Sequence, residues 1–533
     1  PQEGGPHLWG ARFDGREQDP MNSRTILPLS LIVLLACAAE SRPAPRPPPP
    51  PPPPPRAPPA AVMEVPRVTP DAPFRQHAPT AGPEVTFVPP AIESFSLKNG
   101  VHVLLTERHD LPIVSVRLVV QAGAGDLPKE PPGLLSFLGS MLEQGTAKKS
   151  ALEISDAYES IGATHNAWVD WDSAGASVKV TSDKLDAALD LLSDVVMHPA
   201  FPQTEIDRLK ARRLASLQQE KNSVSSMWSN ATGAVLYGRS HPYGNSLYGR
   251  SEDVPKVARA ELVKAHAEIF TPSLAAILVA GDVTKSDLSG RLEAAFGGWR
   301  GAHATVAVPK LPSGPRGEAR VVWVDKPGAP QSLVRLAEVG VPRLAPDRDA
   351  ILVMNTILGG MFSSRINLNL REAHAFTYGA GSSFQMRHGA GHFSVGGSIV
   401  ADKTAPAIAE IFKEVRAMRD RPVSDEELAN AKQNIKRAMP GRFEAVSEVT
   451  GALSDIAVYG LPLDELATRP ARIDKVTADD VVKAARAHLH PDTLKVIVVG
   501  DRKKLEPTLE TLHLGAIEEL DAYGDPIGTP KAP

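Results

Sequence analysis

An internal repeat constrains the fold of this chain more than any other feature of its sequence. The apolar run Leu111–Leu118 matches Ala329–Leu336, and Thr271–Asp282 matches His490–Asp501. The matched prolines are 218 residues apart in the first pair and 219 residues apart in the second. Two matches at nearly the same offset are improbable by chance. The sequence therefore predicts a tandem duplication of one α/β unit.

Within each unit, short β-rich runs alternate with amphipathic helical patterns. Strands are predicted over Val101–Leu105 and Ile113–Val120, and helices over Glu205–Glu220, Ser424–Ala438, Arg259–Ile269 and Ala478–Leu489. The predicted class is α+β, with two homologous domains that each have a mostly antiparallel sheet covered by helices on one side.

Composition shifts divide the chain into predicted segments. They are an upstream extension (1–20), a lipoprotein signal peptide (21–37), a Pro-rich disordered linker (38–90), an N-terminal domain (91–308), a linker (309–318), a C-terminal domain (319–515) and a tail (516–533).

The only cysteine, Cys37, directly follows a short basic and then apolar stretch of signal-peptide length. The apolar stretch is too short to span a bilayer. The sequence Leu34–Cys37 resembles a bacterial lipobox, which implies lipidation of the Cys37 thiol. Because Ala38 follows instead of an aspartate, we expect an outer-membrane anchor that faces the periplasm of a bacterial envelope. The alternative is a secretory signal with a chance cysteine.

The prolines Pro47–Pro55 predict an extended polyproline rod. At about 3.1 Å per residue, the segment Arg42–Pro59 would reach on the order of 50 Å, as a spacer between a membrane and the body. A proline-rich ligand for another domain is the alternative. The net charge of −4 and the pI near 6.5 disfavour a nucleic-acid partner.

One segment of the first unit carries a family resemblance. Residues Gly133–Thr146 read GLLSFLGSMLEQGT and resemble the segment GLAHFLEHMLFKGT of the pitrilysin family. That family includes insulin-degrading enzyme, mitochondrial processing peptidase and the core subunits of the respiratory bc1 complex. The resemblance covers roughly residues 90 to 515 and implies a LuxS/metallohydrolase-like fold.

Members of that family bind zinc through an inverted HxxEH motif on a helix and a distant glutamate. Here Ser136 and Ser140 stand at the histidine positions, Gly139 stands at the glutamate position, and the family's 76-residue step leads from Ser140 to Ser216. Serine is a poor zinc ligand and glycine has no side chain. We therefore expect that this chain binds no cofactor and has no activity alone. A rival role of Ser136 or Ser140 as a nucleophile lacks a visible base.

A second family signature is present. Arg371 and Tyr378 lie seven positions apart and match the arginine and tyrosine that, by resemblance, hydrogen-bond the carbonyl groups of a peptide substrate. The alternatives are a surface ion pair of Arg371 with Glu372 and a half-buried strand position for Tyr378. The segment Thr164–Trp168 resembles the family's substrate-binding edge strand, which makes His165 and Asn166 weaker candidates.

We therefore expect a non-catalytic subunit that pairs with an HxxEH-bearing homologue. That homologue would hold the zinc, and this chain would supply substrate-binding residues for peptide hydrolysis. The alternative is an inert scaffold of the envelope, analogous to the bc1 core subunits. An independent hydrolase has no positive support. The turn His388–His392 shows no carboxylate pattern and is not expected to bind metal.

Overall fold

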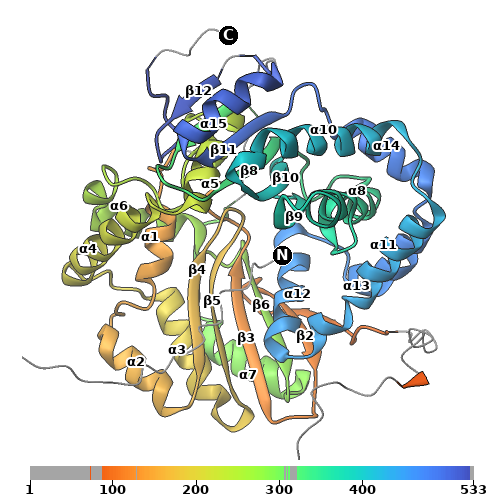
Figure 1. The fold of residues 1–533 in the computed structure, drawn as a ribbon. Coiled ribbons are helices and arrows are strands. Elements are labelled where there is room, and N and C mark those ends of the chain that lie inside the picture. The colour runs from red at the N-terminus through yellow and green to blue at the C-terminus, as the bar shows by residue number, and fades with distance from the viewer. Residues whose placement is uncertain are drawn as a thin grey trace, which may run out of the picture. The chain divides into compact units, whose positions relative to one another are not determined.

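The computed structural model describes residues 72–73, 87–127, 129–304, 308, 310–311, 321–515 and 517–528. The chain divides into two units, 1–83 and 84–533. The predicted signal peptide, Cys37 and the proline rod lie outside the described residues, as does most of the predicted linker 309–318. The second unit contains both halves of the repeat (Figure 1).

The first half forms a six-stranded sheet in the order β1-β2-β6-β3-β5-β4. Strands β2 and β6 pair in parallel, and the other neighbours are antiparallel. The strands are β1 (Glu93–Ser96), β2 (His102–Glu107), β3 (Ile113–Val120), β4 (Thr164–Val169), β5 (Ala174–Thr181) and β6 (Ala275–Gly281).

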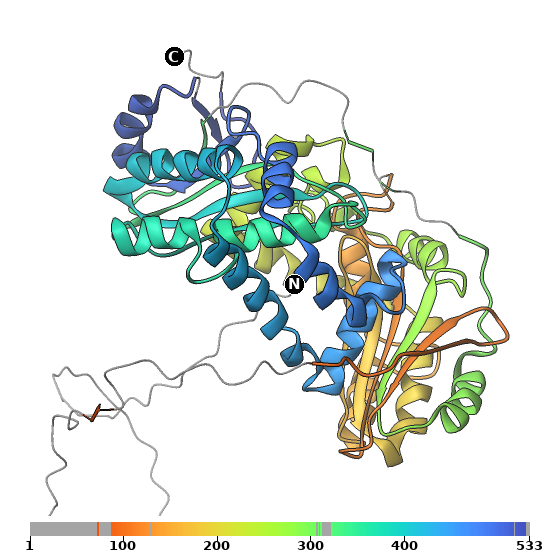
Figure 2. The ribbon, with the colours of Figure 1, turned by 90° about the vertical axis from the view of Figure 1, so that its right-hand side faces the viewer.

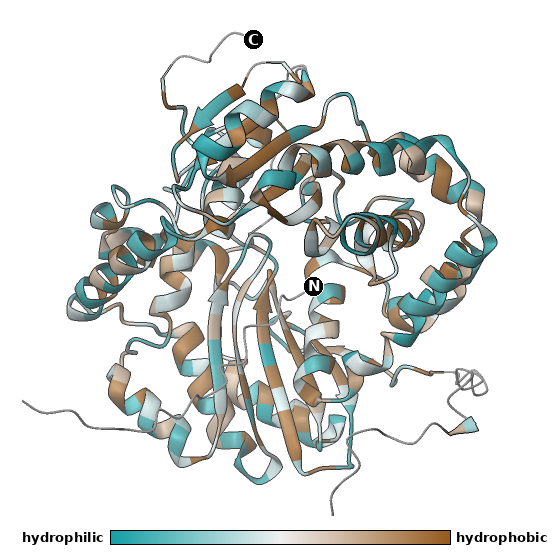
Figure 3. Ribbon diagram, in the orientation of Figure 1, coloured by the Kyte–Doolittle hydropathy of each residue, from teal (hydrophilic) through white to brown (hydrophobic). Residues whose placement is uncertain are grey.

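The second half has the strand order β12-β7-β11-β8-β10-β9, which repeats the first sheet except that its edge strand β12 comes from the end of the half and pairs in parallel with β7. Apolar residues gather in the strands of both sheets (Figure 3). The strands are β7 (Val321–Asp325), β8 (Gln331–Val339), β9 (Thr377–Phe384), β10 (His392–Val400), β11 (Lys495–Gly500) and β12 (Ile517–Leu520). The predicted duplication and the mostly antiparallel sheets are confirmed.

Helices follow the repeat as well. The first half has α1 (Leu134–Met141), α2 (Ala151–Ser160), α3 (Leu185–Met197), α4 (Gln203–Glu220), α5 (Val224–Tyr237), α6 (Arg259–Ile269) and α7 (Lys285–Phe296). The second half has α8 (Arg348–Asn355), α9 (Arg365–Asn367), α10 (Thr404–Asp420), α11 (Asp425–Arg437), α12 (Val446–Tyr459), α13 (Glu465–Lys475), α14 (Ala478–His488) and α15 (Arg502–Leu509). The predicted helices correspond to α4, α6, α11 and α14.

The two halves exchange one helix each, which differs from the expected cover on one side only. Helix α12 lies against β3 and β6 of the first sheet (Figure 2). Its Val449 and Leu453 belong to a buried cluster with residues of these strands. Helix α5 packs Met227 and Trp228 against β8 and β11 of the second sheet. The reason is visible in β6, which is buried along its whole length. A strand that is apolar on both faces needs cover on both.

Residues 517–528 form a second set of contacts between the two halves. Strand β12 pairs in parallel with β7 at the edge of the second sheet. Beyond it, Asp525 accepts two hydrogen bonds from Arg250 of the first half, at 2.7 and 3.0 Å, and a third from Arg239 at 2.9 Å. The structure thus differs from the tail expected over 516–533, because β12 pairs with the second sheet and Asp525 binds arginines of the first half.

A buried polar cluster forms a further contact between the halves. His388, in the turn between β9 and β10, lies 3.4 Å from Asp126 and 3.8 Å from Asp172 of the first half. Tyr459, the last residue of α12, donates a 2.7 Å hydrogen bond to Asp172. The sequence could not show these carboxylates, because they are more than 200 residues away from His388. In the part of the chain that the structure describes, no group of three or more ligand-type side chains could hold a metal ion.

We predict that His388→Gln lowers the free energy of unfolding by about 2 to 4 kcal/mol at pH 6, because Asp126 would be left buried without its counter-charge. Burial lowers the pKa of His388, but the Asp126 carboxylate outweighs burial and raises the pKa from 6.5 to about 9. The stabilisation is therefore complete below pH 6.5 and is lost as the pH rises through about 9.

Urea unfolding of the wild-type protein and of the variant at pH 6 and pH 9.5 measures this difference. His303→Gln, at an exposed position, is the control and should change little at either pH. An equal loss for His388→Gln at both pH values would contradict the ion-pair account.

Candidate functional site

Helix α1 carries three of the four positions at which the pitrilysin motif is degenerate. Ser136 is 5% exposed and donates a 3.0 Å hydrogen bond to the Gly133 carbonyl. Ser140 donates a 3.0 Å hydrogen bond to the carbonyl of Ser136. The hydroxyl groups of Ser136 and Ser140 therefore both donate their hydrogen bonds to nearby backbone carbonyl groups. The oxygens remain available as acceptors on the side that faces α4.

Arg213 of α4, which sequence reasoning missed, occupies that side. Its Nη1 atom donates to Ser136 Oγ at 2.9 Å and to the Tyr248 carbonyl at 3.2 Å, and its Nη2 atom donates to Ser140 Oγ at 3.4 Å. The side chain is 8% exposed, and burial lowers the pKa of the guanidinium. A buried cation therefore lies between the two positions matched to zinc-binding histidines.

Ser216, matched to the distant glutamate, is exposed on α4, one turn after Arg213. The buried positions of this helix include Leu209, Arg213 and Leu217, which are spaced four residues apart and share one face. That spacing is the sequence signal that could have assigned Arg213 to the interior. The charge of the side chain obscured it, because arginine is rarely buried.

Gly139 permits a close approach between α1 and the edge strand β4. A Cβ atom at Gly139 would lie 2.8 Å from the Val169 nitrogen and 2.9 Å from the Trp168 carbonyl carbon. Real Cβ atoms essentially never lie so close to backbone. The strand therefore takes the space that a side chain at this position would need.

Zinc does not fit these residues. The serine oxygens accept hydrogen bonds from a guanidinium, Ser216 points to solvent, and backbone fills the place of the general base. Zinc in proteins is held by cysteine, histidine or carboxylate side chains, and none of the four positions supplies one.

The predicted edge strand is β4, which lies at the end of the first sheet. Asn166 is exposed on it. His165 is held by Glu143, with 2.9 Å between Nδ1 and Oε1, and stacks on Tyr158 at a ring distance of 4.0 Å. His165 is therefore engaged with its own domain, whereas Asn166 is free to meet a ligand.

Arg371 and Tyr378 line one pocket of about 720 Å³ in the second half. Tyr378 is the second residue of β9, which is the edge strand of its sheet, and is 89% exposed. The floor is rich in glycine, and α5 of the first half contributes Ser225. The remaining lining residues are Gln331, Leu333, Arg335, Gly359, Gly360, Met361, Phe362, Asn367, Thr377, Gly379, Ala380, Gly381, Gly396, Gly397 and Ser398.

The Arg371 guanidinium stacks on Phe362 at 4.7 Å from the ring centre and lies 3.5 Å from the Glu372 carboxylate. The surface ion pair considered from the sequence is therefore present, yet it does not remove Arg371 from the pocket. Glu372 is 54% exposed, and an exposed pair of this kind contributes little to stability. Arg371 can exchange this partner for a ligand.

Two π-helical turns, Thr356–Gly360 and Leu368–Ala373, shape the rim of the pocket. A Cβ atom at Gly359 would lie 2.2 Å from the Ser382 nitrogen, so the first turn rests directly on β9. The second turn carries Arg371. π-Helical turns are rare in proteins, and those that occur are often found at functional sites.

Comparison with known families decides the identity of the fold. Residues 102–249 match the profile described as Insulinase (Peptidase family M16), and residues 256–435 match Peptidase M16 inactive domain. The chain belongs to the M16 peptidase family. The first match contains Ser136, Gly139, Ser140 and Ser216, and the second match contains Arg371 and Tyr378.

Individual M16 relatives agree with this assignment. A protein of Helicobacter pylori named non-peptidase homolog YmxG is 22% identical over 76% of this chain and 93% of its own length. The beta subunit of the mitochondrial-processing peptidase of Mus musculus is 24% identical over 81% and 89%. The crystal structure of a peptidase M16 inactive domain from Pseudomonas fluorescens superposes with a TM-score of 0.71 at 26% identity, over 77% of this chain and 98% of that one.

We predict that Gly139→Ala destabilises this M16 protein by about 1 to 3 kcal/mol, because the methyl group would press on the backbone of β4. The matched control is Gly290→Ala in α7, where a Cβ atom meets nothing within 4 Å. It should stabilise the protein by about 0.5 to 1 kcal/mol through helix propensity. Thermal and urea unfolding measure both, and equal shifts of the same sign would contradict the close-approach account.

We also predict that restoring the motif does not restore zinc binding. The variant S136H/G139E/S140H/S216E should retain no stoichiometric zinc after loading and desalting, because Arg213 and the β4 backbone still occupy the site. Elemental analysis measures the retained metal. One zinc per chain would show that only the ligands are missing; a parallel variant with Arg213→Ala added reports how much of the barrier is the guanidinium.

Proposed function

We propose that this chain is the non-catalytic subunit of a two-chain M16 metalloendopeptidase. In this assembly a homologue with intact HxxEH holds the zinc, and this chain contributes Arg371 and Tyr378 to the binding of peptide substrates. The observation that carries the proposal is the shared pocket of these two side chains, in a chain whose own zinc positions are occupied by Arg213 and β4.

The chemistry of the two side chains supports this role. A guanidinium and a phenol both donate hydrogen bonds to oxygen and can stabilise charge that develops on a peptide carbonyl. Their exposure, 89% for Tyr378 and 36% for the side chain of Arg371, leaves them accessible to a substrate. The name of one relative, a subunit of the mitochondrial-processing peptidase, fits an assembly of homologous chains.

We further propose that the protein acts in a bacterial cell envelope, anchored by lipid at Cys37 to the outer membrane and held away from it by the proline rod. This part of the proposal rests on the sequence before residue 60. In the part of the chain that the structure describes, no helix is long and apolar enough to cross a membrane. Radiolabelled fatty acid incorporated into the wild-type protein but not into Cys37→Ala would support the anchor.

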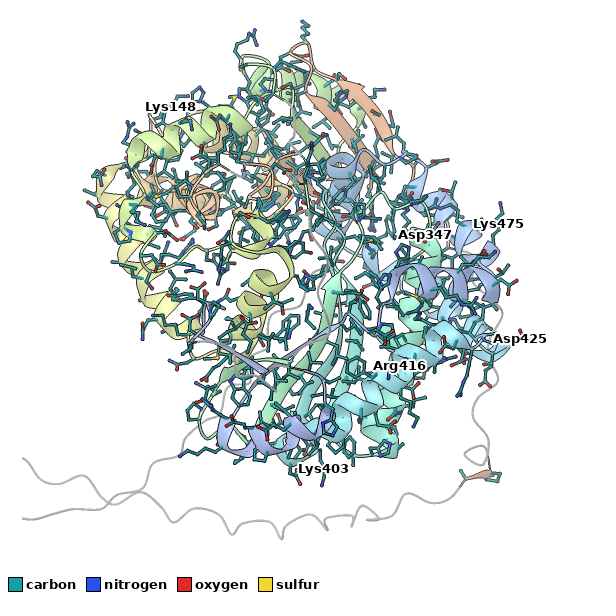
Figure 4. The ribbon with its side chains drawn as sticks, turned by 90° about the horizontal axis from the view of Figure 1, so that it is seen from above. Lys148, Asp347, Lys403, Arg416, Asp425 and Lys475 are labelled. Carbon is teal, nitrogen blue, oxygen red and sulfur yellow. The ribbon has the colours of Figure 1, made fainter. Side chains whose placement is uncertain are left out.

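The test of the subunit role is peptide hydrolysis by this chain alone, by its HxxEH-bearing homologue alone, and by the mixture. We expect activity to be highest in the mixture and to fall about 10- to 100-fold with Arg371→Ala or Tyr378→Phe, because a donor to the reacting carbonyl is lost. Arg416→Ala is the matched control, since Arg416 lies on α10 and is 54% exposed (Figure 4).

Two results would overturn the proposal. Stoichiometric zinc and hydrolysis by this chain alone would make it an enzyme in its own right. A stable complex with the homologue whose activity is indifferent to Arg371 and Tyr378 would favour the scaffold function instead.

A further inference from the structure

The pocket that contains Arg371 and Tyr378 has an unusual charge composition. Its eighteen lining residues include two arginines, Arg371 and Arg335, and no aspartate, glutamate or lysine. Arg335 stacks on Trp228 at 5.5 Å from the ring centre. The Arg371 guanidinium lies 3.5 Å from the exposed Glu372 carboxylate, which does not line the pocket. Because an exposed ion pair of this kind is weak, an anionic ligand can replace Glu372, and the planar fork of arginine matches a carboxylate.

The rim of the pocket is apolar and aromatic. Phe362 is 68% exposed and Tyr378 is 89% exposed, and both line the pocket. Met361 and Leu333 add apolar surface beside them. Large aromatic side chains left in solvent beside a hollow are typical of a recognition surface. They would pack against an apolar side chain next to the anionic group.

The floor leaves room for a peptide backbone. Glycines contribute a third of the lining, and a Cβ atom at Gly379 would meet nothing within 4 Å. The Gly379 position is therefore open toward free space. A peptide could approach β9 closely here because no side chain stands in the way.

We propose that this pocket binds a peptide carboxylate next to an apolar residue, with Arg371 as its counter-charge and Phe362 and Tyr378 as the apolar contacts. This inference rests on the proposed function and names the substrate class for it. The carboxylate can be the free C-terminus of a peptide or the side chain of an internal aspartate or glutamate. The two sources share one chemistry and are separated by experiment.

The test is fluorescence anisotropy of the full chain with a labelled short peptide that ends in Leu-Phe, compared with its C-terminally amidated twin. We expect the free acid to bind at least about tenfold more tightly, which corresponds to one charge-assisted hydrogen-bonded pair. A second amidated pair, with an internal Glu or Gln before the Phe, shows whether a side-chain carboxylate can replace the terminus. A preference in either pair supports the inference and identifies the source.

Variants link the preference to the pocket. Arg371→Gln should abolish the difference between acid and amide, whereas Arg416→Gln, at an exposed position of α10, should retain it. Gly379→Leu should weaken binding of every peptide by filling the pocket, with an unchanged thermal midpoint because the site of the new side chain is open.

The outcomes separate this inference from the proposed function. Equal binding of acid and amide by the wild-type protein, in both pairs, overturns the carboxylate site but leaves peptide binding intact. A preference that survives in Arg371→Gln also overturns it. Failure of every peptide to bind overturns both the inference and the substrate-binding role.

Discussion

The fold depends on two exchanged helices. Each sheet has central strands that are buried on both faces, and each half supplies only part of the cover for its own sheet. Helix α12 closes the first sheet around Leu104, Val119 and Leu278, and α5 closes the second around Val322 and Val499. Removal of either helix would expose a continuous apolar surface on the opposite half. The two halves are copies of one sequence unit, but we expect them to unfold together because each buries apolar surface of the other.

The packing of α1 does not depend on the residues at its motif positions. Helix α1 is held by Leu134, Phe137, Leu138 and Met141, all of which are fully or almost fully buried. None of these residues belongs to the degenerate motif. The motif positions lie on the remaining face, where Arg213 supplies hydrogen bonds to both serines and the backbone of β4 packs on Gly139. This face of α1 therefore satisfies its polar groups within the chain.

Sequence reasoning succeeded where the signal was local or repeated. The offset of the repeat predicted the duplicated sheets, and periodicity predicted α6 with its observed bounds and α14 to within one residue. The resemblance to the family's second-domain signature pointed to Arg371 and Tyr378, and the two side chains line one pocket. Sequence reasoning failed where the contacting residues are far apart in the chain. An apolar pattern such as that of α12 predicts that the helix is buried, but it does not predict which sheet the helix packs against. For the same reason, the sequence around His388 did not predict its contact with Asp126.

Strands β4 and β9 are the corresponding edge strands of the two sheets, but their surroundings differ. At β4 the neighbouring helix α1 packs closely on the strand at Gly139, and His165 is paired within its domain. At β9 the neighbouring turns cap Ala380 and Ser382 through Asn367 and Asn355, yet Tyr378 stays in solvent beside Phe362 and Arg371. Burial of these two aromatic groups by a bound peptide would contribute stability, which agrees with the substrate-binding role proposed for Arg371 and Tyr378.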